Sequence, residues 1–510
     1  MTPIQTLDDR AARTPNATAF IVADDTWTFR VFAQEVRRVA HGLAARDIRK
    51  GDRIALNLPN CPELAVAVYA CFQLGAIAVP LNNRFKAPEL KAMLDRLRPA
   101  LYVGHAELYR EISSLTSTIV PPQRCYIVGA KGDDGHAQCW SDLRGDGSWD
   151  VPLSPPRSPD MHAPALLLAT SGTTGIPKFV IHTLSTIVAT AEQTKYMGIS
   201  ANHTAVIACP MVHAGGIFSF IGCIHHGAPM VLFERFDPEA VLDAIEQHGC
   251  AWQLGLTFMW AAMLEAQRLH RREVRSLRFC ISAGDVCPRQ LQQQFAREFG
   301  VPLYSTWGAS EAIGCLTYGL QSGPISRVAP GAQTRLVDGS GTVVSPGEVG
   351  ELFLRGSNVS IGYWGGPEVI EGAPKDGWYQ TGDLMRQEGR RNLWFMGRKK
   401  DIIIHGGSNI SPVEVETVLR LHPAVRDAAV VGIPDDTLGQ RVAGFVQLQH
   451  DTHSDIVNEI LDAARLQIAD YKLPERLQVI AAIPRNALGK IDRNVLLALA
   501  ADASHSAVAR

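Results

Sequence analysis

The sequence lacks several features that mark common functional classes. It has no block of Lys and Arg, and its formal net charge is only −2 over 510 residues. Electrostatic binding of nucleic acid or of an anionic membrane needs a basic patch, so we expect neither partner. The 10 cysteines include no Cys-x-x-Cys pair and no His/Cys cluster at zinc spacing. We therefore expect free thiols in a reducing compartment, and small molecules as partners.

A leader or membrane segment is also not indicated. The first ten residues, MTPIQTLDDR, contain early acidic side chains and no apolar core, unlike a secretory signal. The most apolar stretch, residues 64–81, has the length of a membrane span but contains Gln73, Gly75 and Pro80. A buried helix that runs into a strand fits this stretch better. We expect a cytoplasmic protein without an integral membrane segment.

The length and the alternation of segments predict an α/β protein with more than one domain. A chain of 510 residues is too long for one compact core, and 46% hydrophobic with 20% charged residues is ordinary for a globular protein. Strand-like and helix-like segments alternate, which indicates mostly parallel sheets covered by helices. Residues 131–163 are rich in Gly, Asp, Ser and Pro and read as a surface connection.

A loop of small and hydroxyl side chains follows the apolar run at residues 163–169. Its sequence is Thr170-Ser-Gly-Thr-Thr-Gly-Ile-Pro-Lys178. The glycines let the backbone approach a phosphate, the hydroxyls donate hydrogen bonds, and the lysine adds positive charge. The order of residues does not fit a Walker loop, so a GTPase-like site is not supported. By composition alone, such a stretch is also typical of a flexible loop without a ligand.

Four single residues in loops after strand-like segments are candidates for chemistry: His213, Glu311, Asp383 and Lys490. A carboxylate suits Mg²⁺ or the hydroxyls of a ribose, and a lysine suits a phosphate. Each also has an ordinary interpretation as a structural histidine, a solvated acid, a turn aspartate or an exposed lysine. Gly215 and Gly216, beside the histidine, would either leave room for an acyl group or allow close helix packing.

These segments, taken in order, resemble the motifs of the adenylate-forming superfamily, which contains acyl-CoA synthetases, nonribosomal adenylation domains and luciferases. The loop at 170–178 matches eight fixed positions of that family's phosphate loop, with Phe179 where the family usually has Gly. Residues 304–311 resemble a later motif, with Trp307 in place of Tyr and Ser310 in place of Thr. Residues 377–383, 397–416 and 484–493 resemble three more, so the resemblance extends from about residue 27 to residue 493.

The resemblance implies a two-domain α/β enzyme. Residues 1–399 would form a large ATP- and carboxylate-binding domain with mostly parallel sheets and covering helices, and residues 400–510 a small mobile α+β domain. The implied cofactors are ATP, Mg²⁺ and coenzyme A. The implied reaction activates an apolar fatty or aryl acid as an acyl-adenylate and transfers it to CoA, which releases pyrophosphate and then AMP.

The resemblance also assigns site residues. It implies catalytic roles for Lys490, Thr173, Glu311 and His213, with Glu311 and Thr173 at the magnesium ion. Asp383 would bind the ribose, Lys400 would be the hinge, and Gly406 with Gly407 would form a wall of the path for the thiol. The implied contacts to ATP and CoA are Thr170, Ser171, Gly172, Thr173, Thr174, Gly175, Lys178, Ser282, Ala283, Gly284, Asp285, Thr306, Trp307, Gly308, Ser310, Asp383, Arg398, Lys400, Gly406 and Gly407.

Several alternatives come from other classes. An amino-acid adenylating enzyme would need a carboxylate near residues 211–216, and that segment has none. A catalytically silent nucleotide-binding protein would be expected to lose Lys490 or Glu311, and both are present. Transfer to a carrier-protein thiol and a luciferase-like oxygenase share all the motifs and stay open. The identity of the acid, including a dicarboxylate selected by an arginine, and the formation of a homodimer also stay open.

Overall fold

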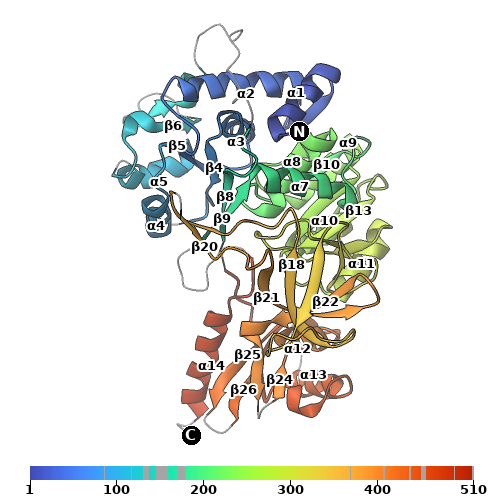
Figure 1. Cartoon of the computed structure of the whole chain (residues 1–510). Helices are drawn as coiled ribbons and strands as arrows, with labels where there is room; N and C mark the ends of the chain where they lie inside the picture. The colour runs from blue at the N-terminus through green and yellow to red at the C-terminus, as the bar shows by residue number, and fades with distance from the viewer. Residues whose placement is uncertain are drawn as a thin grey trace.

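The structure is a computed structural model. It describes the chain except for residues 86, 117, 130–136, 145–158, 171–177, 368, 406–407, 436–437, 450–454, 487–488 and 508–510. Three sheets and their helices form the larger part of the molecule, and a fourth sheet forms a smaller C-terminal part below it in the view of Figure 1. In the part of the chain that is described, none of the helices combines the length and the hydropathy that a membrane crossing needs.

The first sheet has nine strands in the order β20-β19-β9-β8-β4-β3-β5-β6-β7. Its parallel part contains β3 (Arg53–Asn57), β4 (Ile77–Pro80), β5 (Leu101–His105), β6 (Cys125–Val128), β7 (Gln138–Cys139) and β8 (Pro164–Thr170). Three antiparallel strands extend it: β9 (Lys178–Thr183), β19 (Tyr363–Gly366) and β20 (Val369–Glu371). The phosphate loop of the sequence analysis therefore connects two neighbouring strands, β8 and β9.

The second sheet has seven strands in the order β14-β13-β12-β10-β11-β1-β2, and only the pairing of β1 with β2 is antiparallel. Its strands are β1 (Thr18–Val22), β2 (Asp25–Thr28), β10 (Ala205–Ile207), β11 (Met230–Leu232), β12 (Trp252–Leu256), β13 (Phe279–Ala283) and β14 (Leu303–Ser305). These two sheets confirm the prediction of mostly parallel sheets.

Helices cover both sheets because the crossover between two parallel strands must pass over a sheet face. Those of the larger part are α1 (Pro3–Arg13), α2 (Phe29–Ala44), α3 (Pro62–Leu74), α4 (Ala87–Leu97), α5 (Ala106–Thr116), α6 (Trp140–Leu143), α7 (Leu184–Gln193), α8 (Ala214–His226), α9 (Pro238–His248), α10 (Thr257–Leu269) and α11 (Arg289–Phe299).

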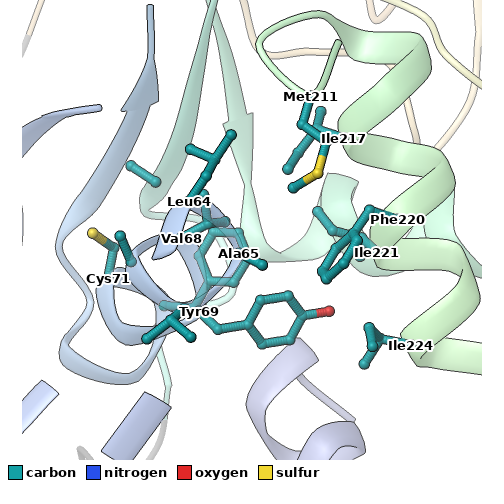
Figure 2. Packing of buried hydrophobic residues seen from close by; sticks show 14 of the residues in the cluster. Leu64, Ala65, Val68, Tyr69, Cys71, Met211, Ile217, Phe220, Ile221 and Ile224 are labelled. Atoms are coloured by element: carbon teal, nitrogen blue, oxygen red, sulfur yellow. The ribbon is translucent and has the colours of Figure 1, made fainter. Parts of the chain in front are cut away.

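The apolar stretch at residues 64–81 is a buried helix followed by a strand, as expected. Helix α3 is buried at every position from Leu64 to Phe72, because it packs against α2 and α1, and through Tyr69 against Phe220 of α8, within a core shared by both sheets. Figure 2 shows Tyr69 of α3 beside Phe220 and Ile224 of α8. Gly75 ends α3 with φ of +69°, a conformation that costs a glycine little. Strand β4 begins two residues later.

The third sheet differs from the predicted pattern because it is antiparallel throughout. Its order is β15-β16-β22-β21-β18-β17. The strands are β15 (Leu316–Tyr318), β16 (Ile325–Val328), β17 (Gln333–Val337), β18 (Val349–Arg355), β21 (Tyr379–Glu388) and β22 (Asn392–Arg398). Between β15 and β22 the described chain has turns and strands but no helix, so consecutive strands cannot be joined by helical crossovers.

The chain passes into the fourth sheet through a single 3₁₀ turn at Lys399–Asp401. This sheet contains β23 (Ile403–His405), β24 (Ser408–Ile410), β25 (Val425–Asp435), β26 (Gly439–Leu448) and β27 (Arg476–Val479), with helices α12 (Pro412–Leu419), α13 (Ile456–Arg465) and α14 (Arg493–Ala507). The change of sheet supports the division into residues 1–399 and 400–510, which we retain as a proposal.

Candidate active site

A cavity of about 1660 Å³ lies between the larger part of the molecule and the C-terminal part. Its lining includes residues at the carboxyl ends of parallel strands: Thr170 of β8, Leu256 of β12 and Ala283 of β13. Ligands of open α/β sheets bind at this edge, where the backbone and the loops that follow the strands converge. The C-terminal part closes the cavity with Lys490 and Arg485, among others.

Asp383 on β21 is a buried carboxylate in the wall of this cavity. Its Oδ2 accepts a hydrogen bond of 2.7 Å from the indole nitrogen of Trp307. Its Oδ1 lies 3.3 Å from Nε of Arg398, yet makes no hydrogen bond in the described structure. Burial raises the pKa of Asp383, while Arg398 and Trp307 oppose that rise. A ligand hydroxyl would satisfy the unpartnered oxygen, as a ribose does.

Trp307 has a role that sequence reasoning missed. It was expected to be among the contacts to ATP and CoA, and it does line the cavity. Its indole N–H also orients the carboxylate of Asp383, and its backbone N–H donates to Ser326 Oγ at 2.6 Å. The pair with Asp383 joins residues 76 positions apart. A local motif contains no signal for such a contact.

Glu311 lies in the loop after β14 and lines the cavity. Its Oε1 accepts a hydrogen bond of 2.7 Å from the hydroxyl of Tyr363. The ammonium of Lys178 lies 5.1 Å from the centroid of the Tyr363 ring. Burial, and then the negative charge of Glu311, raises the pKa of Tyr363, so this phenol stays a donor. Tyr363 is not among the site residues expected from the sequence, and the structure adds it through this hydrogen bond.

Lys490 enters the cavity from the C-terminal part on a tight turn. The backbone of Asn486 donates to the Lys490 carbonyl at 2.8 Å, and Gly489 takes φ of +78° within the turn. Burial lowers the pKa of Lys490, and the nearby Arg398 lowers it further. The carboxylates of Asp285, Asp383 and Glu311 have the opposite effect. The ammonium thus lies within electrostatic range of three acids and one arginine that line the same cavity, where its charge is available to an anionic ligand.

Arg485 joins the same turn to the larger domain. Its guanidinium lies 3.2 Å from Asp285 Oδ2 and 2.5 Å from Asp427 Oδ2. Asp285, one of the expected contacts to ATP and CoA, follows β13, whereas Asp427 belongs to β25. One side chain therefore bridges the two parts of the molecule beside Lys490. The ion pair of Arg485 with Asp285 spans 200 positions and was not predicted.

His213 precedes α8 and lines the cavity. Burial lowers the pKa of His213 to about 4, with smaller effects from Lys490 and Arg84. The imidazole is therefore neutral near pH 7. Both glycines beside it line the cavity, but a Cβ on Gly216 would lie 2.3 Å from the Pro210 carbonyl oxygen, whereas one on Gly215 would meet only Leu254 Cδ2, at 3.4 Å. Close packing explains Gly216, and space for a ligand remains an explanation for Gly215.

One end of the cavity is apolar, and we call it the acyl end. It lies beyond His213, where α7, the 3₁₀ turn at Thr194–Met197, α8, β12 and β15 meet. Its walls include Met197, Phe218, Trp252, Leu254 and Leu316. The indole N–H of Trp252 donates to the Met197 carbonyl at 2.8 Å, which ties two of these walls together. We call the opposite end, around Asp383, Glu311 and Lys490, the nucleotide end.

The structure brings most of the predicted site residues to this one cavity. Those that line it are Thr170, Lys178, His213, Ala283, Gly284, Asp285, Thr306, Trp307, Gly308, Ser310, Glu311, Asp383, Arg398, Lys400 and Lys490. Ser282 is not among them, because its side chain is fully buried and its hydroxyl lies 3.1 Å from that of Thr257. Ser171, Gly172, Thr173, Thr174, Gly175, Gly406 and Gly407 lie outside the described residues.

Comparison with known families agrees with this geometry. The sequence model described as AMP-binding enzyme matches residues 7–364, and that of the AMP-binding enzyme C-terminal domain matches residues 414–490. The chain belongs to the AMP-binding enzyme family. The two matched regions fall on either side of the 3₁₀ turn at Lys399–Asp401. The cavity of this AMP-binding enzyme is lined by residues of both regions and by residues of the segment between them, such as Asp383, Arg398 and Lys400.

Relatives and solved structures are similar over nearly the whole chain. An indoleacetate–CoA ligase of Aromatoleum aromaticum (strain DSM 19018 / LMG 30748 / EbN1) is 30% identical over 96% of this chain and 96% of its own. A medium-chain fatty-acid–CoA ligase of Escherichia coli (strain K12) is 31% identical over 92% and 85%. The crystal structure of the anthranilate CoA ligase AuaEII with anthranoyl-AMP superposes with a TM-score of 0.90 at 26% identity, covering 99% of this chain and 98% of the other.

Proposed function

We propose that this protein is an AMP-forming acyl-CoA synthetase that activates an apolar acid through an acyl-adenylate and transfers it to coenzyme A. The observation that carries the proposal is the position of Lys490, whose ammonium lies among Asp285, Asp383 and Glu311 in the cavity between the two domains. The relatives named above are aryl- and fatty-acid CoA ligases. An ammonium in this place stabilises the charge of a phosphoryl transfer.

ATP fits the nucleotide end of the cavity. The buried Oδ1 of Asp383 would accept a ribose hydroxyl, and Arg398 beside it would contact ribose and phosphate. Residues 283–285 line the place where adenine would lie. The triphosphate would extend toward Thr170 and Lys178, which lie opposite each other on β8 and β9 at the two ends of the phosphate loop.

The first half-reaction needs no general base. The substrate carboxylate is already a nucleophile and attacks the α-phosphorus, and pyrophosphate leaves in line. Lys490 stabilises the charge on the phosphoryl oxygens, and the neutral imidazole of His213 borders the carboxylate without adding a second positive charge. Glu311, oriented by Tyr363, would hold Mg²⁺ together with Thr173, and the cation would neutralise phosphate charge.

The second half-reaction needs a different arrangement, since Lys490 occupies the cavity. We propose that the C-terminal domain rotates about Lys400, which lies in the 3₁₀ turn between the third and fourth sheets. The rotation removes Lys490 and brings Gly406 and Gly407 to form a wall of the path for the CoA thiol. The thiol then attacks the acyl carbonyl, and AMP leaves. A cytoplasmic location and a homodimer stay predictions, as does CoA in preference to a carrier protein.

The test is pyrophosphate release with a panel of carboxylic acids, measured with and without CoA. We expect ATP- and acid-dependent pyrophosphate release without CoA, because adenylation precedes thioester formation. Addition of CoA should convert the burst into steady turnover with acyl-CoA as the product. Turnover with a carrier-protein thiol but not with CoA would show that the acyl acceptor is the carrier protein. Oxygen-dependent light emission would favour the luciferase-like alternative.

A further inference from the structure

The acyl end of the cavity contains buried oxygen atoms without hydrogen-bond partners. In the described part of the chain, nine buried side-chain atoms that can form hydrogen bonds have none. Three of the nine belong to residues that line the cavity: Asp383, Thr190 and Gln193. The first lies at the nucleotide end and fits a ribose hydroxyl. Since unpartnered buried polar atoms are rare and costly, the other two also need an explanation.

Thr190 and Gln193 lie on one face of α7, because residues three apart on a helix are neighbours. Thr190 is fully buried, and its Oγ1 is one of the unpartnered atoms. Helix α7 is fixed against α8: a Cβ on Gly222 would lie 2.5 Å from Thr194 Oγ1. The two polar residues therefore belong to a wall of the acyl end that packs against α8, among the apolar side chains described above.

The orientation of the Gln193 amide is determined by its surroundings. Its Nε2 donates a hydrogen bond of 3.0 Å to the Pro330 carbonyl, which only the nitrogen can do. The unpartnered atom is thus the amide oxygen, a pure acceptor. Gly314 lies against the base of this side chain, since a Cβ on that glycine would come within 3.2 Å of Gln193 Cβ. By contrast, the hydroxyl of Thr190 can either donate or accept.

The charges around the cavity limit what these atoms can bind. None of the described lining residues from α7, the 3₁₀ turn at Thr194–Met197, α8, β12 and β15 carries a charge. A second carboxylate on the substrate would be desolvated there, without a cation and facing the amide oxygen of Gln193. A neutral hydroxyl or amino group would donate to that oxygen. A hydroxyl could accept from Thr190 at the same time, and an amine could donate to it.

We propose that the acid substrate carries a neutral hydroxyl or amino group on the part of its acyl group remote from the carboxylate, bound by Gln193 and Thr190. This inference rests on the proposed acyl-CoA synthetase activity, since it concerns the acid in the same cavity. It disfavours the dicarboxylate that the sequence left open. The competing explanation is that ordered water satisfies both oxygens, in which case the enzyme would show no preference for a donor.

The experiment compares matched acids that differ in one group. Benzoic, phenylacetic and cinnamic acids would be tested with hydrogen, methyl, hydroxyl or amino at the ring position opposite the acid, together with fatty acids with and without a terminal hydroxyl. The measured quantity is kcat/KM for pyrophosphate release without CoA. In at least one series we expect the hydroxyl or amino acid to exceed its hydrogen and methyl analogues by roughly 10- to 100-fold, the usual effect of leaving a buried acceptor unpaired.

Two variants test the named residues. Gln193→Met keeps the side-chain length and removes the acceptor, and Thr190→Val keeps the shape and removes the hydroxyl. Each should reduce the ratio of hydroxyl to methyl acid, by about tenfold for Gln193→Met. Ser219→Ala is the matched control, because Ser219 also lines the acyl end but its hydroxyl already donates to the Gly215 carbonyl at 2.6 Å. That variant should keep the wild-type ratio, and thermal melting should show that all three are folded.

The outcomes separate this inference from the proposed function. Release of pyrophosphate with equal kcat/KM for donor and non-donor acids would overturn the inference and leave the synthetase activity intact. A ratio unchanged in both Gln193→Met and Thr190→Val would likewise overturn it. Preference for a dicarboxylate over its monocarboxylate analogue would do the same. If none of the acids supports ATP-dependent pyrophosphate release, the proposed function fails, and the inference fails with it.

Discussion

The two ends of the cavity are built in different ways. The nucleotide end is charged, with Asp383, Arg398, Glu311 and Lys490 within short motifs that also contain their flanking turns. The acyl end is uncharged, and its residues come from elements that are distant in the sequence: α7, α8, β12 and β15. The difference teaches that the charges for nucleotide chemistry lie within short sequence motifs, whereas acid selection depends on the packing of distant elements. Changes at the two ends should therefore alter different kinetic constants.

The largest effect should follow Lys490→Ala, which removes the movable charge of the nucleotide end. Acyl-adenylate formation should fall by roughly 10²- to 10³-fold, as on removal of one preorganised donor to a developing charge. Conversion of supplied acyl-adenylate to acyl-CoA should stay near the wild-type rate, because Lys490 has left the cavity by then. Single-turnover assays of the two half-reactions measure both rates.

A matched control for this variant is Lys472→Ala. Lys472 belongs to the same domain, pairs with Glu414 at 2.8 Å and does not line the cavity. Both half-reactions should stay near wild type in the control. Equal damage to both half-reactions in Lys490→Ala would contradict the proposed division between two domain positions.

A pH effect on stability should arise behind the acyl end, at His182. This histidine is fully buried, its Nε2 lies 2.9 Å from the Ser310 carbonyl, and its ring packs on Phe218. Burial lowers the pKa of His182 from 6.5 to about 4. The imidazole of His182 therefore takes up a proton more readily in the unfolded chain than in the folded protein. The stabilisation of the folded state by the neutral imidazole is complete above pH 6.5 and is lost as the pH falls toward 4.

Protonation of His182 should lower the free energy of unfolding by at most about 3 kcal/mol. We expect His182→Gln to have a smaller fall of stability between pH 6.5 and 4 than wild type, measured by chemical denaturation at a series of pH values. His213, with a pKa also lowered to about 4, should contribute in the same direction in both proteins. His162→Gln, at an exposed position, is the control and should reproduce the wild-type slope. If the stability of His182→Gln fell with pH as steeply as that of wild type, the imidazole of His182 would not be buried in its neutral form.

A smaller effect is expected from Asp383→Asn at the nucleotide end. The substitution keeps the shape but places an amide beside the Trp307 indole and Arg398, and it removes the charged acceptor for the ribose. The KM for ATP should rise roughly 10- to 100-fold, the range for a lost hydrogen bond to a charged group. The ratio of kcat/KM between different acids should not change. A changed preference among acids would show that the nucleotide end also affects the selection of the acid, contrary to the proposed independence of the two ends.

The smallest effect should follow Trp307→Phe, which keeps an aromatic plane and removes only the indole N–H. Asp383 Oδ2 would lose its 2.7 Å hydrogen bond, but the carboxylate itself would remain. We expect the KM for ATP to increase a few-fold, roughly 2- to 10-fold, because one hydrogen bond is lost. The double variant with Asp383→Asn should cost less than the product of the two single effects, since both act through one pair. Independent effects would show that Trp307 acts by another route.

The sequence by itself determined the α/β class, the order of the motifs and the residue types at the nucleotide end. It could do so because a phosphate loop, a buried helix and a strand are specified by neighbouring residues. The tertiary structure alone decided that Trp307 meets Asp383, that Tyr363 meets Glu311 and that Arg485 meets Asp285, across 76, 52 and 200 positions.

The acyl end of the cavity was also decided by the tertiary structure. The amide nitrogen of Gln193 donates to the Pro330 carbonyl, across 137 positions, and the amide oxygen has no partner. This arrangement depends on the position of α7 beside the segment that contains Pro330. Contacts of this kind depend on strand order and on helix packing, and no spacing along the chain encodes them. The motifs could therefore predict that an acid is activated, whereas the chemistry of its far end depends on side chains that only the fold brings together.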